Sequence, residues 1–389
     1  MFAQLPGDLG RIPIFREEDF YGTGLRCLEE LIQVRGYPVE SREVVTEDGY
    51  VLGIYRIPRG RLETEETTTG SPYLDCDGAS RPPLLLVHGL LGSAVTWVTN
   101  YADQSLGYVL ADAGYDVWLG NLRGSTLARK HVKLNPDSNI SFWDFTFDQM
   151  IEYDVPAMID YVLRETGNSR LGYIGHSQGT LIMFGLLSSV PAYNDKVGLF
   201  VALAPVATPV HAIFIARQQL LALSERPSKP LWKKIADKPC RMQESLYLCE
   251  SVWSTIFGPS VMFNVLVKTG RFCKYDYGAA KNKEIYRQTA PPCYPLEEIR
   301  APVAIFWGHG DTLSRPQDVD RIRNRISSIV VDERVGSGPF NHVDFIYGVH
   351  VKRVLYDRMI QVIGQFYSTC LTRSTSESTT ATPHENAKS

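Results

Sequence analysis

A serine between two glycines, placed after an apolar run, constrains the fold of this chain more than any other feature. Residues 175–179 read Gly-His-Ser-Gln-Gly and follow the apolar residues 171–174. The next residues, 180–187, are apolar and predict a buried helix. The glycines allow a sharp turn from strand to helix, which presents the hydroxyl of Ser177 at the edge of a sheet. The pattern therefore predicts a serine nucleophile for acyl-transfer chemistry.

A serine hydroxyl is a weak nucleophile, so it needs a general base that is oriented by a carboxylate. In this strand–serine–helix arrangement both partners follow the serine in the chain, the acid first. The predicted strand 302–307 is followed by Asp311, and the predicted strand 329–335 is followed by His342. We therefore predict that Ser177, Asp311 and His342 form a catalytic triad.

Other acids and histidines are assigned non-catalytic roles. Asp318 and Asp320 follow Pro316 in a predicted helix and are expected to be solvated. Hydrogen-bonded structural roles are expected for three further histidines: His131, His309 and His350.

The oxyanion of a tetrahedral intermediate needs two backbone N–H donors, one after the nucleophile and one after an early strand. Gln178 supplies the first. The second follows the predicted strand 84–87, where the turn 88–92 contains two glycines, so Leu90 is the predicted donor. His88 is expected to brace this turn.

Sequence blocks along the chain match one family pattern, at 36–60, 84–98, 116–131, 142–161, 175–180, 275–278, the loop of Asp311, and 341–348. On these blocks the chain resembles the acid lipases of animals, which include gastric, lingual and lysosomal acid lipases. The resemblance implies hydrolysis of neutral-lipid esters, triacylglycerols or sterol esters, by a secreted or lysosomal glycoprotein. It also implies Ser177, Asp311 and His342 as the triad, with Leu90 and Gln178 as oxyanion donors.

The order of predicted elements indicates an α/β protein with the α/β-hydrolase fold, a mostly parallel sheet with helices on both faces. After a hairpin, strands and helices alternate: strands 43–46 and 50–57, strand 84–87, helix 102–113, strand 115–119, helix 147–165, strand 171–174, a helix from 178 and strand 199–204. We divide the chain into a catalytic core at 1–205 and 301–370, a mainly helical cap or lid at 206–300 and a disordered Ser/Thr-rich tail at 371–389. Residues 61–81 are expected to form a surface loop.

The predicted cap contains the apolar stretches 214–223 and 247–267. These either pack against the core or line an acyl-chain pocket beneath a lid that meets lipid. Compared with the family pattern, the segment 250–260 is shortened. If this segment belongs to the lid, substrate choice or interfacial activation is expected to differ from that of gastric-type lipases.

Composition excludes several partner classes. The net charge is −3 with a pI near 6.3, and the basic residues form no clustered stripe, so no nucleic-acid partner is expected. The sequence carries no metal-ligand or phosphate-loop spacing, so no cofactor or metal is expected. It also lacks an apolar run long enough for a transmembrane segment. The expected partner is a neutral-lipid ester at a lipid–water interface.

Two features of the sequence favour export of the chain, and its amino terminus does not. The seven cysteines and the sequon at Asn139, a candidate N-glycosylation site, favour an extracellular or lysosomal location. By resemblance to the family, Cys240 and Cys249 are the expected disulfide, and two free buried thiols are the alternative. The amino terminus shows no signal peptide, so either a leader is missing or the chain is not exported.

The sequence thus predicts a lipase that acts through an acyl-enzyme. Two alternatives stay open: an esterase or thioesterase for soluble acyl substrates, and a non-catalytic lipid-binding protein on the same fold. The complete predicted triad argues against the last.

Overall fold

The computed structural model of the 389-residue chain describes residues 24–63, 81–208 and 271–380. Most of the expected surface loop at 61–81 and most of the expected cap lie outside these residues. The predicted pair Cys240 and Cys249 lies outside them too. The division into core, cap and tail therefore stays a prediction.

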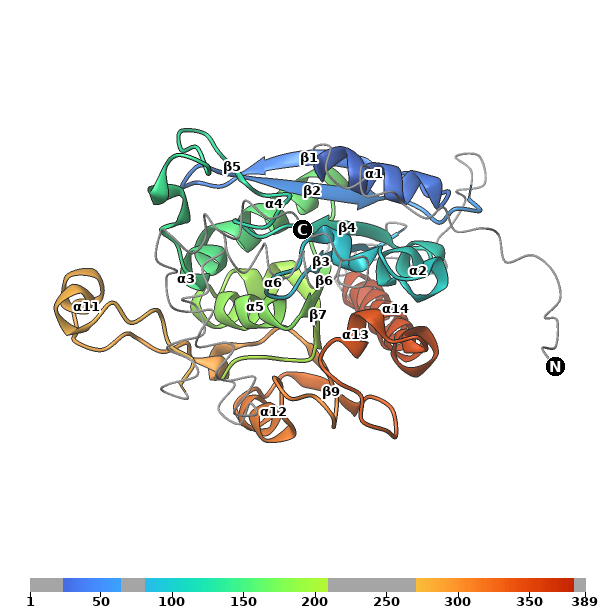
Figure 1. Ribbon diagram of the computed structural model, residues 1–389. Helices are drawn as coiled ribbons and strands as arrows, with labels where there is room; N and C mark the ends of the chain where they lie inside the picture. Colours follow the sequence, from blue (N-terminus) through green and yellow to red (C-terminus); the bar gives the residue numbers. More distant parts are fainter. Residues whose placement is uncertain (1–23, 64–80, 209–270, 381–389) are drawn as a thin grey trace, which may run out of the picture.

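A mostly parallel sheet forms the centre of the described protein (Figure 1). Its strands are paired in the order β1-β2-β4-β3-β6-β7-β8-β9, and β5 pairs with β2. The two pairings of β1–β2 and β2–β4 are antiparallel, and those from β4 through β3, β6, β7 and β8 to β9 are parallel. The strands are β1 (Glu40–Val45), β2 (Tyr50–Ile57), β3 (Pro83–Val87), β4 (Asp116–Gly120), β5 (Lys130–His131), β6 (Leu171–His176), β7 (Val197–Leu203), β8 (Val303–Trp307) and β9 (Ile329–Arg334).

Helices cover both faces of the sheet. In Figure 1, α3 to α6 lie on one side of the central strands, and α1, α2, α13 and α14 lie on the other. The α-helices are α1 (Gly24–Val34), α2 (Leu106–Asp112), α3 (Phe147–Gln149), α4 (Val155–Thr166), α5 (Gln178–Ser189), α6 (Tyr193–Lys196), α11 (Ala279–Tyr286), α12 (Pro316–Arg323), α13 (Asp344–Tyr347) and α14 (Asp357–Thr380). Short 3-10 helices are η2 (Ala94–Trp97), η3 (Ala102–Gln104), η4 (Ile140–Trp143) and η6 (Leu296–Glu298), and π-helices are η5 (Met150–Asp154) and η7 (Lys352–Tyr356). Among the described residues, none of these helices has the length and apolar character needed to cross a bilayer.

The central strands are apolar on both faces because helices bury both. Every residue of β3, β6 and β7 is buried, as expected for the inner strands of a parallel sheet. Two hydrophobic cores result, one on each face of the sheet. One contains Met158 of α4 and Leu181 of α5, and the other contains Leu110 of α2 and Met359 of α14.

The predicted strands are found with shifts of a few residues, but helices differ from expectation at three places. The helix predicted at 102–113 is divided into the 3-10 helix Ala102–Gln104 and α2, Leu106–Asp112. The helix predicted at 147–165 is interrupted by the π-helix Met150–Asp154. Helix α14 continues to Thr380, so the residues 371–380 of the predicted disordered tail are helical. The reason is that α14 is already nucleated by its packed first turns, and extending a formed helix costs far less than starting one.

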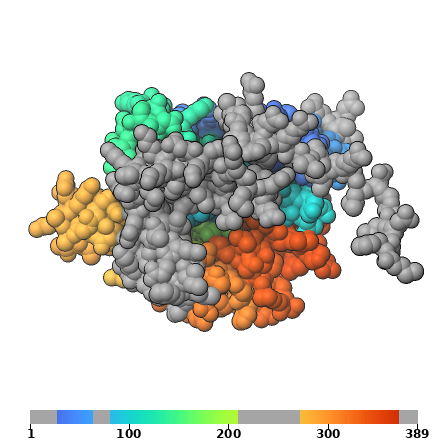
Figure 2. Space-filling view, viewed as in Figure 1, coloured from blue at the N-terminus to red at the C-terminus, as the bar shows by residue number. Residues whose placement is uncertain are grey.

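A segment that contains α11 projects from the body of the protein (Figures 1 and 2). A disulfide between Cys273 and Cys293 closes its base. Beside the disulfide, the buried carboxylate of Asp148 in α3 accepts hydrogen bonds from the Tyr275 N–H at 2.8 Å and from the Tyr294 hydroxyl at 2.7 Å. The segment is thus anchored to the body at its base. This cysteine pairing was not predicted from the sequence.

Candidate active site

Ser177 lies on a strained turn between β6 and α5. Its backbone angles are φ 52° and ψ −113°, a conformation that residues with a side chain rarely adopt. The turn is held by the Ser177 N–H, which donates to the Leu203 carbonyl at 3.0 Å. Gly179 allows α5 to approach the sheet, because a Cβ there would lie 2.3 Å from the Val87 carbonyl oxygen. The local sequence therefore builds the sharp elbow that the glycine–serine–glycine pattern predicts.

The structure brings Ser177, His342 and Asp311 together in one hydrogen-bonded chain. The Ser177 Oγ lies 2.7 Å from the His342 Nε2, and the His342 Nδ1 lies 2.8 Å from the Asp311 Oδ2. All three side chains are buried. A carboxylate only accepts hydrogen bonds, so Nδ1 carries the hydrogen and Nε2 is left to accept the serine proton. This arrangement can activate the hydroxyl as a nucleophile.

Asp311 is itself held in place by the loop that follows β8. Its Oδ1 accepts the N–H groups of Leu313 at 2.8 Å and Ser314 at 2.7 Å. The Ser314 hydroxyl donates to the Pro205 carbonyl at 2.5 Å, which ties this loop to the end of β7. One carboxylate oxygen is therefore committed to the loop and the other faces His342.

The turn after β3 lies directly against the nucleophile. The Gly92 N–H donates to the Gly89 carbonyl at 3.1 Å, which closes the turn around Leu90. A Cβ on Gly89 would lie 3.1 Å from the Ser177 Cβ. Gln178 is the first residue of α5, where backbone N–H groups point outward from the helix end. The turn that contains Leu90 and the first residue of α5 thus both adjoin Ser177, and these are the two segments that were predicted to supply oxyanion donors.

His88 braces this turn, as expected. Its Nδ1 lies 2.8 Å from the Gly89 carbonyl, and its Nε2 accepts the Leu122 N–H at 3.2 Å. Burial lowers the pKa of His88 to about 4, so the ring is neutral near pH 7. The neutral ring connects the turn after β3 to the loop after β4.

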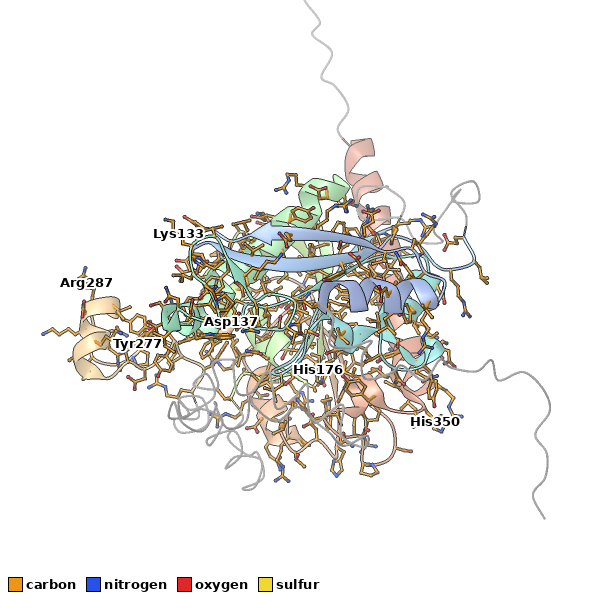
Figure 3. All side chains as sticks on the ribbon, turned by 45° about the horizontal axis from the view of Figure 1, so that its top comes forward. Lys133, Asp137, His176, Tyr277, Arg287 and His350 are labelled. Carbon is orange, nitrogen blue, oxygen red and sulfur yellow. A yellow bond between two sulfur atoms is a disulfide. The ribbon has the colours of Figure 1, made fainter. Side chains whose placement is uncertain are left out.

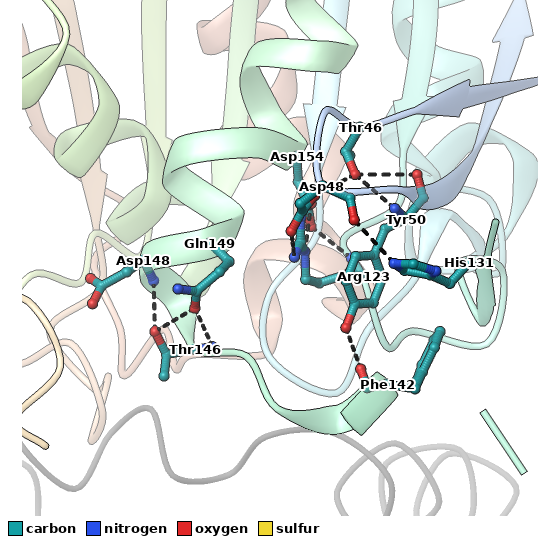
Figure 4. A network of polar contacts seen from close by, with 10 residues as sticks. All are labelled: Thr46, Asp48, Tyr50, Arg123, His131, Phe142, Thr146, Asp148, Gln149 and Asp154. Atoms are coloured by element: carbon teal, nitrogen blue, oxygen red, sulfur yellow. Dashed lines mark hydrogen bonds and ion pairs between the residues drawn. The ribbon is translucent and has the colours of Figure 1, made fainter. Parts of the chain in front are cut away.

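The loop after β4 is fixed by a buried charge cluster, which we define as Arg123, Asp48 and Asp154 (Figure 4). The Arg123 guanidinium donates to Asp154 at 2.7 Å and to both oxygens of Asp48 at 2.6 and 2.9 Å. The Arg123 N–H also donates to Asp154, at 2.8 Å. The guanidinium lies 4.0 Å from the centre of the Tyr50 ring. The cluster therefore joins the β1–β2 hairpin, the loop after β4 and the π-helix η5.

The ionisation of the cluster follows from burial and pairing. Burial alone would lower the pKa of Arg123, but the two carboxylates outweigh it and the pKa is raised. Burial raises the pKa of Asp154, against the opposing effect of Arg123. Burial also acts to raise the pKa of Asp48, but hydrogen bonds from Arg123 and Thr46 outweigh it and the pKa is lowered. The guanidinium is thus a permanent cation inside the protein.

One predicted location is wrong. Asp318 was expected to be solvated, but it is buried with 3% of its surface exposed. It lies in the first turn of α12 on the side that also buries Val319 and Ile322, and a helix amino terminus stabilises a carboxylate there. Asp320 is exposed, as expected.

The three histidines outside the site differ in their surroundings. His131 is structural, because its Nδ1 accepts the N–H groups of Lys133 and Leu134 and its Nε2 lies 3.0 Å from the Asp48 carbonyl. His309 and His350 are exposed, and no structural hydrogen bond of their side chains is seen in the described part of the chain. Figure 3 shows His350 far from His176, the residue before the nucleophile.

Sequence reasoning did not single out His176 or Arg123. His176 was visible only as the variable position of the serine motif. Arg123 lies in one of the family-like blocks, but nothing local identifies its partners. Among the described residues, no group of histidines, cysteines and carboxylates has the arrangement of a metal site.

Comparisons with known proteins agree with this geometry. A family model described as alpha/beta hydrolase fold matches residues 82–349, and one described as a partial alpha/beta-hydrolase lipase region matches residues 28–101. The gastric triacylglycerol lipase of Bos taurus is 34% identical over 87% of this chain and 91% of its own length. Lipase 1 of Drosophila melanogaster is 35% identical over 87% of this chain and 80% of its own length.

This chain belongs to the α/β-hydrolase lipases. The fold agrees, since a carboxylesterase of Bacillus subtilis superposes with a TM-score of 0.50 at 14% identity, over 88% of this chain and 96% of the other. The predicted fold class and the predicted family are therefore confirmed. As a member of this lipase family, the chain is a carboxylic ester hydrolase.

Proposed function

We propose that this lipase hydrolyses neutral-lipid esters, triacylglycerols or sterol esters, with Ser177 as nucleophile, His342 as general base and Asp311 as the orienting acid. The observation that carries the proposal is the hydrogen-bonded chain from the Ser177 Oγ through His342 to Asp311, with distances of 2.7 and 2.8 Å. The names of the related gastric triacylglycerol lipases support the substrate class.

The proposed reaction has two halves. Ser177 Oγ attacks the ester carbonyl carbon while its proton moves to the His342 Nε2, and the N–H groups of Leu90 and Gln178 bind the oxyanion. His342 then gives its proton to the departing alcohol, which leaves an acyl group on Ser177. In the second half a water molecule loses a proton to His342 and attacks the acyl-enzyme, and the fatty acid departs as Ser177 regains its proton.

The proposal extends to the setting of the enzyme. The sequon at Asn139 lies on an exposed stretch, and the Asn139 side chain accepts the Ser141 N–H at 2.9 Å in a local turn. The sequon at Asn139, the disulfide between Cys273 and Cys293 and the family resemblance support a secreted or lysosomal location. We propose a lipid–water interface as the place of action.

The test is fatty-acid release from emulsified long-chain triacylglycerol and from a sterol ester, with wild type beside Ser177→Ala. Wild type should release fatty acid, and Ser177→Ala should lose about 10⁴-fold or more of the turnover while its unfolding transition is unchanged. Substantial turnover by Ser177→Ala would refute the assigned nucleophile.

A soluble ester measured below and above its solubility limit tests the substrate class. A lipase should gain rate when droplets form. Cleavage of soluble esters with no increase in rate at the interface would instead identify an esterase for soluble substrates. A wild-type protein that cleaves none of the esters would be identified as a lipid-binding protein.

A further inference from the structure

His176 is a buried histidine that the reaction described above does not use. It is the last residue of β6 and directly precedes Ser177, with 7% of its surface exposed. Its Nε2 lies 2.9 Å from the main-chain carbonyl oxygen of His342. A carbonyl oxygen only accepts a hydrogen bond, so the Nε2 of His176 carries a hydrogen and donates it. The residue before the nucleophile is thus bonded to the main chain of the proposed base.

The same ring also contacts the turn after β3. A Cβ on Gly89 would lie 3.0 Å from the His176 Nδ1, so the oxyanion turn passes directly beside the ring. On the other side, the rings of His176 and His342 lie 5.0 Å apart between their centres. His176 therefore fills the space between the turn of Leu90 and the loop of His342, at the centre of the molecule as seen in Figure 3.

Within the described part of the chain, three hydrogen bonds hold His342, and one of them is lost during the reaction. Its side chain bonds Asp311 and Ser177, and its carbonyl accepts from His176. When Ser177 carries the acyl group, its Oγ no longer has a proton to donate to His342. The contacts with Asp311 and His176 are then the ones that remain, at the stage when His342 must activate water.

The His176 ring is also a steady donor. Burial, and next the nearby charge of His342, lower the pKa of His176 to about 3. The ring consequently stays neutral while His342 becomes a cation in each half of the reaction. Its hydrogen bond is not consumed by any proton transfer in the proposed mechanism.

We propose that His176 is a positioning residue that holds the main chain of His342 in place on the acyl-enzyme, so that deacylation depends on it more than acylation does. The proposal rests on the proposed roles of Ser177 and His342. His176 supports the reaction through the main chain of His342, and no proton transfer of the proposed mechanism passes through its ring.

The experiment follows p-nitrophenyl butyrate, a soluble ester, by stopped flow. The variants are His176→Leu, which removes the donor, and His176→Gln, whose amide nitrogen can donate from nearly the same place. His131→Leu is the matched control, because it also removes a half-buried histidine that holds backbone N–H groups, but it lies on β5, which pairs with β2 and not with β6. Titration with a phosphonate inhibitor counts the competent sites in each preparation.

Per competent site, His176→Leu should lower the deacylation rate by about tenfold or more while acylation falls by no more than about threefold. Acyl-enzyme should then accumulate, and a burst of p-nitrophenol should appear with an amplitude equal to the enzyme concentration. His176→Gln should recover deacylation to within about threefold of wild type. His131→Leu should change the number of competent sites and not the ratio of the two rates.

Several results would overturn the proposal. Equal losses of acylation and deacylation in His176→Leu would show a general structural role, as would a His176→Gln variant no better than His176→Leu. If His176→Leu does not fold, His176→Asn replaces it, because its shorter amide cannot reach the His342 carbonyl, and the same criteria apply. Turnover that persists in Ser177→Ala would instead refute the proposed nucleophile, which is a separate failure.

Discussion

Two buried regions hold loops at the edge of the same sheet, and they do so by different physical means. The serine elbow, residues 175–179, is held by close backbone packing and by uncharged hydrogen bonds, such as the one from Ser177 N–H to Leu203. The charge cluster of Arg123, Asp48 and Asp154 is held by ion pairs. The side chain of Arg123 at its centre is 0% exposed.

The difference shows which change each region cannot accept. The elbow has no room for an added atom, but its hydrogen bonds do not depend on a charged partner. The cluster can accept a change of shape at Asp48, whose side chain is partly exposed. The buried charges of Arg123 and Asp154 each depend on a partner of opposite charge. Steric substitutions should therefore damage the elbow first, and neutralising substitutions should damage the cluster first.

The largest combined effect, on activity and on stability together, is expected for Gly179→Ala in the elbow. The new Cβ would lie 2.3 Å from the Val87 carbonyl oxygen, so helix α5 must move away from β3 and carry Ser177 with it. We expect a loss of about 100-fold in kcat/KM and of roughly 3 kcal/mol in the free energy of unfolding. Ester hydrolysis and urea denaturation measure both. Gly338→Ala, where nothing lies within 4 Å of the new atom, is the control, and an active, stable Gly179→Ala would contradict the steric account.

The next effect, which falls on stability alone, is expected for Arg123→Met in the cluster. Methionine keeps most of the volume but leaves two carboxylates without their cation, so the free energy of unfolding should fall by about 3 to 5 kcal/mol. The same substitution at Arg358, which pairs with Glu333 at the surface with side-chain exposures of 41% and 37%, should cost less than about 1 kcal/mol. Equal losses at the two positions would remove the distinction between buried and exposed pairs.

Acid should weaken the elbow and the adjoining turn of His88 before it weakens the cluster. The pKa values of His88 and His176, about 4 and about 3, lie below the usual value near 6.5. Between about pH 6.5 and these lowered pKa values, the two histidines bind more protons in the unfolded chain than in the folded one. The free energy of unfolding therefore falls as the pH falls through this range. The pKa of Asp48 is lowered from 3.8, so its contribution to stability begins to be lost only as the pH falls below about that value.

Urea denaturation at pH 6.5 and pH 5 measures this effect. Each histidine should account for on the order of 2 kcal/mol of the loss. His88→Gln and His176→Gln should each show a smaller loss than wild type, because glutamine does not titrate. If both variants lose as much stability between pH 6.5 and pH 5 as wild type does, other groups take up the protons.

The smallest effect is expected for Asp48→Asn. The Asp48 side chain is 26% exposed, and water can compensate part of the lost ion pair. We expect a loss of about 1 kcal/mol at pH 7, well below that of Arg123→Met. A loss as large as that of Arg123→Met would show that the edge of the cluster behaves like its interior.

The catalytic geometry was predictable because its signals are local. Ser177, Asp311 and His342 each follow a predicted strand, and the carboxyl ends of parallel strands lie at one edge of the sheet. The turn of Leu90 follows the same logic after β3. The alternation of apolar strands and helices was enough for the fold class.

The supporting contacts were not predictable because their partners are distant in the chain. Arg123 pairs with Asp154 and Asp48, which are 31 and 75 residues away, and His176 bonds a residue 166 positions away. Asp318 was expected in solvent because it is acidic, but it lies on the face of α12 that packs against the core. Tertiary packing decides such positions, and a single sequence does not report it.

The disulfide between Cys273 and Cys293 turns the projecting segment into a closed covalent loop. Lys281, Lys283 and Arg287 are exposed on or beside α11 within that loop and offer cleavage sites to trypsin-like proteases. A cut there would divide the polypeptide into two pieces that stay joined through sulfur, and they would separate on a gel only after reduction. A nicked, two-chain form of this lipase would thus pass for an intact one wherever thiols are absent.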